Sequence, residues 1–178
     1  MTTQGPVRIL MVCVGNQCRS PLAERLLQAR TGPGSHVAVS SAGTIGPSGI
    51  PMDAHAAAEL ARLGGTSDGF LSRRVTPQLL ADQDLILAMT RDLRTEVLRM
   101  APRLMRRSFT LAEFAGILSS NSISGSTPQE TVLEAAAQRA RAPHELDIRD
   151  PIGLSTNVHR TVANEIDAHV GVLAARLE

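Results

Sequence analysis

The stretch VRILMVCVGNQCRSP, residues Val7–Pro21, decides the fold. Its first half, Val7–Val14, is apolar apart from one arginine and is rich in branched side chains, as expected of a short buried parallel strand. The glycine and asparagine at 15–16 then allow a tight turn, and Ser20 with Pro21 supplies an N-cap and a preorganised first helical position. The stretch therefore predicts a strand, a loop and a helix in immediate succession.

The rest of the chain repeats this order of strand and helix. We expect strands at 7–14, 36–40, 84–90 and 107–111, and helices at 20–30, 51–63, a short one from 76, 91–100, 127–141 and 155–177. Such alternation implies parallel strands joined by right-handed crossovers, with helices on both faces of the sheet. The predicted fold class is α/β, a three-layer α/β/α arrangement.

Length and composition limit the domain count. A chain of 178 residues has the size of one domain, so residues 1–178 are expected to form a single unit. Small polar residues at 119–127, SSNSISGST, predict a flexible surface loop within it.

Composition also excludes several classes of function. All eighteen basic residues are Arg, so Schiff-base, pyridoxal phosphate and Walker-lysine chemistry are absent. Trp and Tyr are absent and the net charge is +1, so we expect no nucleic acid partner. No apolar stretch is long enough for membrane insertion, and two cysteines are too few for a secreted disulfide framework. A cytoplasmic location is expected.

The loop after the first strand carries the residues of an anion site. In Cys13–Ser20, CVGNQCRS, successive backbone N–H groups form a nest, and the helix N-terminus adds its partial positive charge. Arg19 can return across the turn and offer two parallel N–H donors to a phosphate. A Cys13 thiol on the floor of this nest is expected to ionise near neutral pH and to act as a nucleophile. The residues expected to bind phosphate are Val14, Gly15, Asn16, Gln17, Cys18 and Arg19.

Three further residues are expected to assist. Asn16 tolerates a left-handed conformation, and its side-chain amide can pin the loop. Ser20, as the N-cap, can direct its hydroxyl at the Cys13 sulfur and steady it as a leaving group. Asp150, in an Asp-Pro turn at the loop edge of the sheet, can protonate the departing oxygen and later accept a proton from water. Asp147, three residues earlier, is the competing candidate for this acid.

The wider sequence resembles the low-molecular-weight protein tyrosine phosphatases, including their bacterial members. The likeness lies in VCVGNQCRSPLAERLL (12–27), SSAGT (40–44), DLILAMT (84–90) and the later Asp150-Pro151, in the order of that family. It implies a four-stranded parallel sheet and hydrolysis through a phosphocysteine intermediate, without metal or cofactor. Cys13, Arg19 and Asp150 would be catalytic, and Ser41 would support the loop. The implied substrates are protein phosphotyrosine or small aryl phosphates, with inorganic phosphate as product.

The residues around the expected cleft depart from this resemblance. Members of the family that act on phosphotyrosine commonly have aromatic walls, including one or two aromatic residues after the Asp-Pro. Here Ile152 and Gly153 follow Pro151, and the stretch IGPSGIP at 45–51 has no aromatic residue. We therefore expect a wider cleft, which can also suit another aryl or alkyl phosphate.

Cys18 has two interpretations. It is either a small residue that packs in the loop or a resolving thiol, which protects Cys13 from overoxidation through a reversible disulfide. A zinc site on the two cysteines is not expected, because none of the five histidines at 36, 55, 144, 159 and 169 has a ligand spacing to them. His159 and His169 are interpreted as ordinary histidines of the last helix.

Two other functions stay open from the sequence. Arsenate reductases share this fold and loop, since arsenate mimics phosphate, but they need additional thiols, so this chain would need an external one besides Cys18. A non-catalytic phosphate-binding regulator is the other alternative. The joint presence of Cys13, Arg19, Ser20 and Asp150 argues against it.

Overall fold

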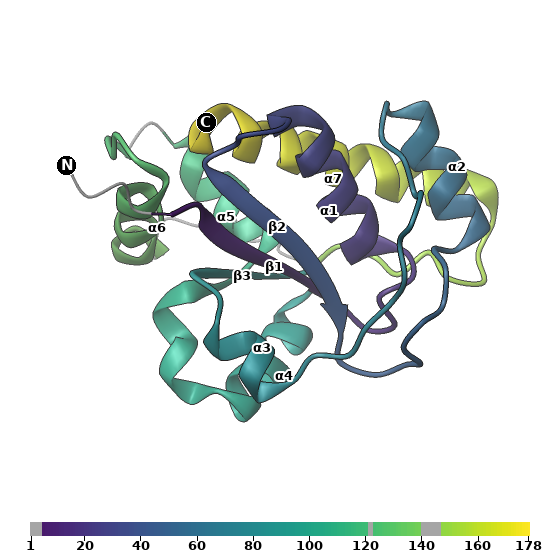
Figure 1. Ribbon diagram of the computed structural model, residues 1–178, viewed down its shortest axis with the longest axis horizontal. Helices are drawn as coiled ribbons and strands as arrows, with labels where there is room; N and C mark the ends of the chain where they lie inside the picture. Colours follow the sequence, from purple (N-terminus) through teal and green to yellow (C-terminus); the bar gives the residue numbers. More distant parts are fainter. Residues whose placement is uncertain (1–4, 121–122, 140–146) are drawn as a thin grey trace.

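Four parallel strands form the centre of the protein (Figure 1). The computed structural model describes residues 5–120, 123–139 and 147–178. The strands are β1 (Val7–Cys13), β2 (Val37–Gly43), β3 (Leu85–Ala88) and β4 (Ser108–Thr110), and their order in the sheet is β2-β1-β3-β4. Since β1 is central and buried, it needs apolar side chains on both faces, which explains its nearly continuous hydrophobic run.

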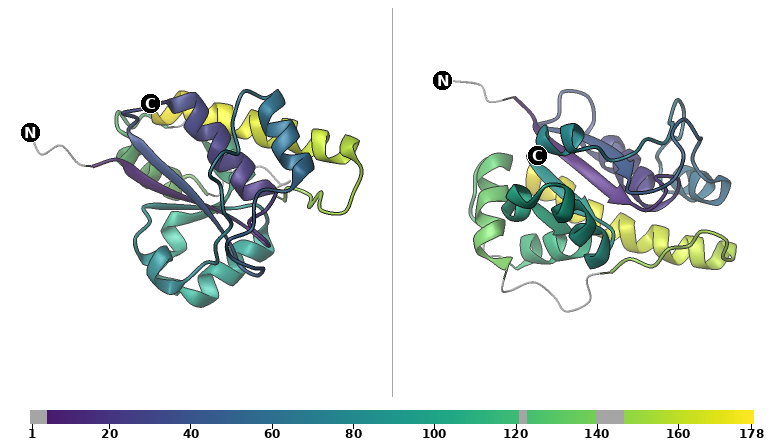
Figure 2. Two further views of the ribbon diagram at one scale, coloured as in Figure 1. Left: turned by 45° about the vertical axis from the view of Figure 1, so that its right-hand side comes forward. Right: turned by 90° about the horizontal axis from the view of Figure 1, so that it is seen from below.

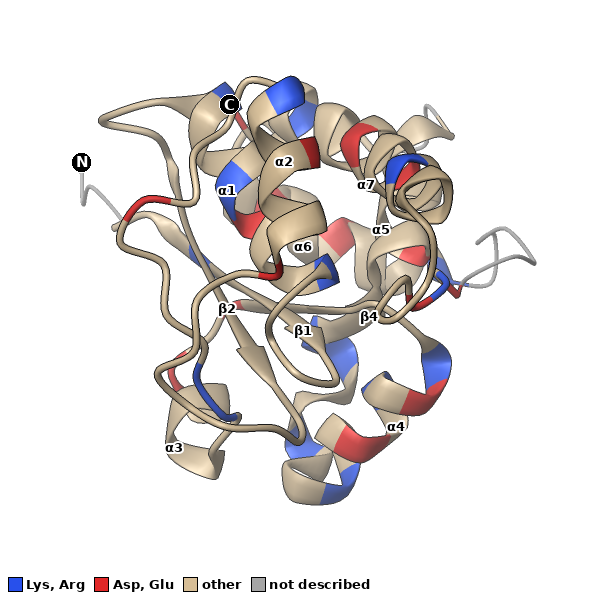
Figure 3. Ribbon diagram, turned by 90° about the vertical axis from the view of Figure 1, so that its right-hand side faces the viewer, with Lys and Arg blue, Asp and Glu red and all other residues tan. Residues whose placement is uncertain are grey.

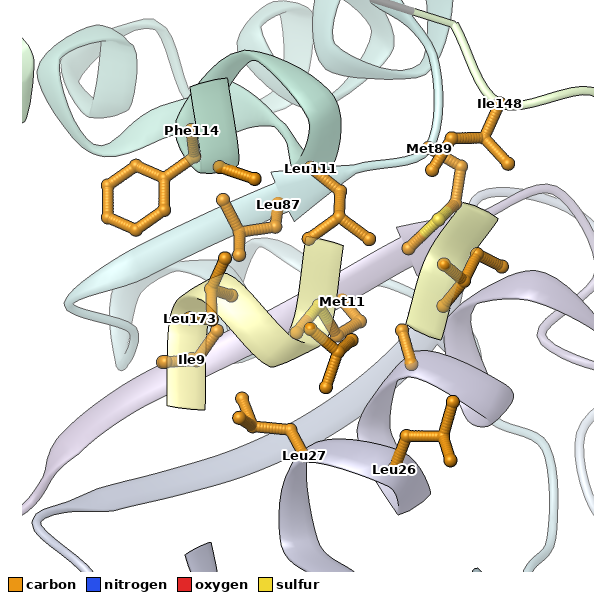
Figure 4. Close-up of a cluster of buried hydrophobic side chains, with 14 of the residues drawn as sticks. Ile9, Met11, Leu26, Leu27, Leu87, Met89, Leu111, Phe114, Ile148 and Leu173 are labelled. Carbon is orange, nitrogen blue, oxygen red and sulfur yellow. The ribbon is translucent and has the colours of Figure 1, made fainter. Parts of the chain in front are cut away.

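Alternate side chains of β1 enter two separate cores. The side chains of Leu10 and Val12 lie in the smaller core. The side chains that lie in the larger core are those of Val7, Ile9, Met11 and Cys13. This follows from the period of two residues in a strand. Cys13 therefore leaves the sheet on the side of the larger core, which Figure 4 shows around Met11 and Leu87.

Helices cover both faces of the sheet (Figures 1 and 2). The larger core is covered by α1 (Arg19–Thr31), α2 (Ala54–Arg62), α5 (Leu111–Ser119) and α7 (Thr156–Leu177). The smaller core lies under α3 (Pro77–Ala81), α4 (Arg91–Met100) and the 3-10 helix η1 (Pro102–Arg107). Helix α6 (Pro128–Ala137) packs beside η1, α5 and α7. The predicted three-layer α/β/α fold with four parallel strands is confirmed.

Two predicted bounds are wrong, and two elements were not predicted. Helix α1 begins at Arg19 with Cys18 as its N-cap, so Ser20 lies inside the first turn. Helix α5 and the helix η1 were not expected at all. Strand β2 runs on to Gly43, three residues beyond the predicted end at Ser40, and this extension brings it beside the loop that follows β1.

The polar stretch at 119–127 lies partly outside the described residues, as do residues 140–146 at the predicted end of the helix from 127. Within the described part, the Ile123 side chain is buried in the larger core. The backbone N–H groups of Ser124 and Gly125 donate to the Glu134 carboxylate at 2.8 and 3.2 Å. These contacts attach the stretch to α6.

Candidate active site

The loop 14–18 joins the carboxyl end of β1 to the start of α1, at the edge of the sheet that faces the viewer in Figure 3. Since β1 has β2 on one side and β3 on the other, the chain passes from β1 to β2 through α1 over the larger core, and it then crosses β1 to reach β3, partly through α3 over the smaller core. Such a position is where open α/β sheets bind their ligands.

Two hydrogen-bond donors point at the Cys13 sulfur. The Asn16 backbone N–H donates to Sγ at 3.2 Å, and the Ser20 hydroxyl donates to it at 3.0 Å. Cys13 itself is 2 % exposed. Donors of this kind stabilise negative charge on a sulfur that is otherwise removed from water.

Asn16 holds the loop in shape. It has a φ of 53°, and it is the one non-glycine residue in the described part of the chain with a positive φ. Its side-chain amide donates to the hydroxyls of Ser20 at 3.0 Å and Ser41 at 2.8 Å, while its carbonyl oxygen accepts from the Arg73 N–H at 2.9 Å. Arg73, which was expected to be a solvated basic residue, also donates from its Nε to the Ser41 carbonyl.

Strand β2 clamps the loop through its last residue. The N–H groups of Thr44 and Ile45 donate to the carbonyls of Cys13 and Val14 at 3.0 and 2.9 Å. A Cβ at Gly43 would lie 2.5 Å from the Val14 carbonyl oxygen and 2.8 Å from the Asn16 nitrogen. Only glycine therefore allows this approach of β2 to the loop.

Arg19 and Asp150 meet at the mouth of the site. Arg19 is 3 % exposed; its Nη1 donates to the Ile148 carbonyl at 2.9 Å and its Nη2 forms an ion pair with Asp150. Its buried Nε has no hydrogen-bond partner among the described residues. The Asp150 side chain is 43 % exposed and accepts from the Ile152 N–H. The mouth thus combines a buried guanidinium with an accessible carboxylate.

A cavity of about 130 Å³ connects these groups. It is lined by Cys13, Val14, Gly15, Gln17, Cys18, Arg19, Asp150 and Ile152. The fold thus brings Asp150 to the phosphate loop across more than a hundred residues. Asn16, Ser20 and Ser41 lie behind the cavity and form its hydrogen-bonded support.

Asp147, the competing acid, lies elsewhere. Its carboxylate accepts from the backbone N–H, Nε and Nη2 of Arg91 at 2.7 to 3.2 Å, at the start of α4. The hydrogen bond from the Arg91 side chain lowers the pKa of this carboxyl below its usual range. A carboxylate that is fixed in this way does not reach the cavity that Cys13 lines.

The Cys18 side chain contacts helix α7. Both cysteines are free thiols, and the Cys18 Sγ lies 3.7 Å from His159 Nδ1. Burial raises the pKa of the Cys18 thiol, and the negative charge of Asp53 adds to this effect. Cys18 is therefore held as a neutral thiol, unlike a nucleophile. The sequence did not predict that His159 and Asp53 lie near the loop. The Asp53 N–H in fact donates to the Gln17 carbonyl at 2.8 Å.

Comparison with known proteins identifies the family of this chain. The profile of the family "Low molecular weight phosphotyrosine protein phosphatase" matches residues 8–131, which include the whole loop. The chain belongs to this family. Low molecular weight phosphatases act on phosphoproteins. The match extends well beyond the loop and covers most of the chain.

Three relatives place the chain within the low molecular weight phosphatases. Over 106 residues it is 40% identical to the low molecular weight protein-tyrosine-phosphatase Etp of Escherichia coli (strain K12). The aligned residues make up 60% of this chain and 70% of Etp. Over 173 residues it is 29% identical to the protein-arginine-phosphatase of Geobacillus stearothermophilus, with 97% of both chains covered. The crystal structure of a low molecular weight protein tyrosine phosphatase from T. tengcongensis superposes with a TM-score of 0.76 at 26% identity, over 96% of this chain and 99% of that one.

None of the helices in the described part of the chain has the length and apolar character needed to cross a membrane.

Proposed function

We propose that this chain hydrolyses phosphate monoesters on proteins, with Cys13 as nucleophile, Arg19 as phosphate ligand and Asp150 as general acid and base. The observation that carries the proposal is the position of the Cys13 sulfur. It receives two hydrogen bonds on the floor of a cavity whose mouth holds Arg19 and Asp150. The family match supports the reaction class, but it ends at residue 131, before Asp150.

The first step is phosphoryl transfer to sulfur. The Cys13 thiolate attacks phosphorus, a P–S bond forms, and the P–O bond to the substrate breaks. Asp150, in its protonated form, gives its proton to the leaving oxygen as that bond breaks. The backbone N–H groups of the loop and the Arg19 guanidinium stabilise charge on the three phosphoryl oxygens.

The second step releases phosphate. Asp150, now a carboxylate, accepts a proton from the water that attacks phosphorus, and the Cys13 sulfur leaves with its electron pair. The Ser20 hydroxyl and the Asn16 N–H already donate to this sulfur at 3.0 and 3.2 Å, so they stabilise it as a leaving group. Inorganic phosphate is the product, and neither step needs a metal or an organic cofactor.

Arg19 has to change partners during this cycle. Its ion pair with Asp150 must open before Asp150 can carry a proton, and a phosphate dianion can replace the carboxylate on Nη2. The buried Nε, which has no partner among the described residues, would donate to a second phosphoryl oxygen. Substrate binding would therefore free the acid that the reaction needs.

A second candidate substrate is phosphoarginine. The arginine phosphatase of Geobacillus stearothermophilus aligns with 97% of this chain, including the segment with Asp150. None of the eight described residues that line the cavity is aromatic, so a phenyl ring finds no aromatic wall; Val14, Gln17 and Ile152 lie there instead. Phosphotyrosine in proteins remains the first candidate because the family profile and Etp carry that name.

The test compares two peptides of identical sequence, one with phosphotyrosine and one with phosphoarginine, together with p-nitrophenyl phosphate. Cys13→Ser should abolish hydrolysis of all three while phosphate binding persists. Asp150→Ala should lower kcat on the peptides by about 10²- to 10⁴-fold. Its effect should be smaller on p-nitrophenyl phosphate, whose leaving group needs little protonation.

Asp147→Ala is the matched control and should leave kcat within about twofold of wild type, since Asp147 pairs with Arg91 outside the cavity. A larger loss in Asp147→Ala than in Asp150→Ala would overturn the assignment of the acid. The ratio of kcat/KM between the two peptides decides the substrate class. No turnover of any substrate by wild type would refute the proposed function and favour a phosphate-binding regulator.

The location of the protein and its partners follow from the same proposal. A phosphatase whose nucleophile is a thiolate needs a reducing compartment, so we place the protein in the cytoplasm with phosphorylated proteins as partners. Fractionation of the producing cells, with the protein followed by antibody, checks this placement.

A further inference from the structure

Three side chains with different metal-binding groups meet behind the phosphate loop. They are Cys18 of the loop, Asp53 before α2 and His159 in the first turn of α7. His159 Nδ1 lies 3.7 Å from Cys18 Sγ and 3.8 Å from Asp53 Oδ1, and the ligand atoms of all three lie within 4.8 Å of one another. One imidazole nitrogen therefore faces both a thiol and a carboxylate.

These distances match the edges of a small coordination tetrahedron. With bonds of about 2.3 Å to sulfur and about 2.0 to 2.1 Å to nitrogen and oxygen, tetrahedral zinc places sulfur and nitrogen about 3.6 Å apart, and nitrogen and oxygen about 3.3 Å apart. The observed separations of 3.7 and 3.8 Å differ from these values by half an ångström or less. Small side-chain rotations would bring the three atoms to a common centre.

The surroundings of the three side chains provide space for an ion and a route by which it can enter from solvent. Cys18 and His159 are buried, and both line a cavity of about 10 Å³, roughly the space of one water-sized sphere. The Asp53 side chain is 29 % exposed, so an ion can enter along it. Its Oδ1, the oxygen that lies 3.8 Å from His159 Nδ1, also accepts two N–H bonds as the cap of α2.

The charges near the cluster also permit a cation. Arg19 borders the same small cavity, but its charge is paired with Asp150. A thiolate and the Asp53 carboxylate would neutralise a divalent ion. A soft thiolate combined with imidazole and carboxylate is a donor set that suits four-coordinate zinc and not magnesium or calcium.

We propose that Cys18, Asp53 and His159 form a zinc-binding site behind the phosphate loop, where Cys18 borders both this site and the catalytic cavity. Binding forms bonds from zinc to Sγ, Nδ1 and a carboxylate oxygen, and the thiol proton passes to the buffer. The fourth position takes a water or the imidazole of His55, whose ring centroid is 4.9 Å from that of His159. The ion joins the loop, α2 and α7, so it stabilises the folded chain.

The test uses Cys13→Ser protein, in which the catalytic thiol can no longer bind the metal and the result does not depend on catalysis. Zn²⁺ is titrated against a chromogenic chelator under reducing conditions, and Co²⁺ is added separately as a spectroscopic probe. We expect one Zn²⁺ per chain and a higher Tm. The Co²⁺ form should show a thiolate charge-transfer band in the near ultraviolet and the intense visible bands of a tetrahedral site.

Four second-site variants in this background locate the ligands. Cys18→Ala should abolish the charge-transfer band. Asp53→Asn, which keeps an N-cap side chain for α2, and His159→Asn should each weaken Zn²⁺ binding by about 100-fold or more. His169→Asn on the same helix is the matched control and should bind like its parent.

The proposal is overturned if Cys13→Ser protein binds no Zn²⁺, or if the cobalt spectrum lacks a thiolate band. It is equally overturned if Asp53→Asn and His159→Asn, both checked for folding by circular dichroism and phosphate binding, retain the parent affinity.

Discussion

Gly43→Ala tests whether β2 fixes the shape of the phosphate loop. The added Cβ would lie 2.5 Å from the Val14 carbonyl oxygen, where ordinary contact begins at 3.4 Å, so one backbone must move by about 0.9 Å. Overpacking of this kind costs about 1–3 kcal/mol, which lowers Tm by roughly 2–12 °C in a domain of this size. A displacement near 1 Å in a catalytic loop lowers kcat/KM by about 10²-fold.

The assay is kcat/KM on p-nitrophenyl phosphate together with thermal unfolding. Gly171→Ala is the matched control, because its new Cβ would meet nothing nearer than the Arg30 side chain at 3.8 Å. Gly171 lies inside α7, so alanine should stabilise that helix by about 0.5–1 kcal/mol and leave turnover unchanged. If Gly43→Ala keeps both the Tm and the kcat/KM of wild type, the clamp by β2 does not determine the loop geometry.

Three further predictions concern the loop and its surroundings. Asn16→Ala removes three hydrogen bonds within the buried support, so urea unfolding should show a loss of about 1–3 kcal/mol and kcat/KM should fall; unchanged values would contradict the role of its side chain. Since Cys18 is a buried neutral thiol beside His159, a dithiol should reverse peroxide inactivation equally in wild type and in Cys18→Ala; recovery of wild type alone would instead identify Cys18 as a resolving thiol. The lowered pKa of Asp147 means that its ion pair with Arg91 stabilises the fold above pH 3.8 and is lost as pH falls further. Melting curves of wild type and Asp147→Asn should therefore differ at pH 7 and converge in acid, and a constant difference would contradict this.

Much of the fold follows from local sequence patterns. Buried parallel strands such as β1 and β3 are short apolar runs, and the turns that follow them carry small or capping residues. Helix α5 was missed because seven of its nine residues are buried, which leaves no polar stripe with a helical period. The capping box of Thr110 and Glu113 was the available signal, but Thr110 had been assigned to the preceding strand.

The candidate site could also be predicted only in part from the sequence. Cys13, Asn16, Arg19 and Ser20 lie within eight residues, so the geometry of one turn brings them together and the sequence was sufficient. Asp150 was found through its Asp-Pro turn, but its distinction from Asp147 needed the position of Arg91. A backbone N–H such as that of Arg73 is present whatever the side chain is, so its hydrogen bond to Asn16 cannot be predicted from the residue type.

The cluster of Cys18, Asp53 and His159 shows why spacing along the chain was a poor guide to metal ligands here. Cys18 and His159 are 141 residues apart, and they meet because α7 packs across α1 and α2. The same loop therefore presents two thiols to two environments: Cys13 toward its hydrogen-bond donors in the catalytic cavity, and Cys18 toward a buried imidazole. Since the two thiols have different partners, Cys13→Ser can abolish hydrolysis without removing any proposed zinc ligand. Activity and metal binding can therefore fail independently, so each proposal can be refuted while the other stands.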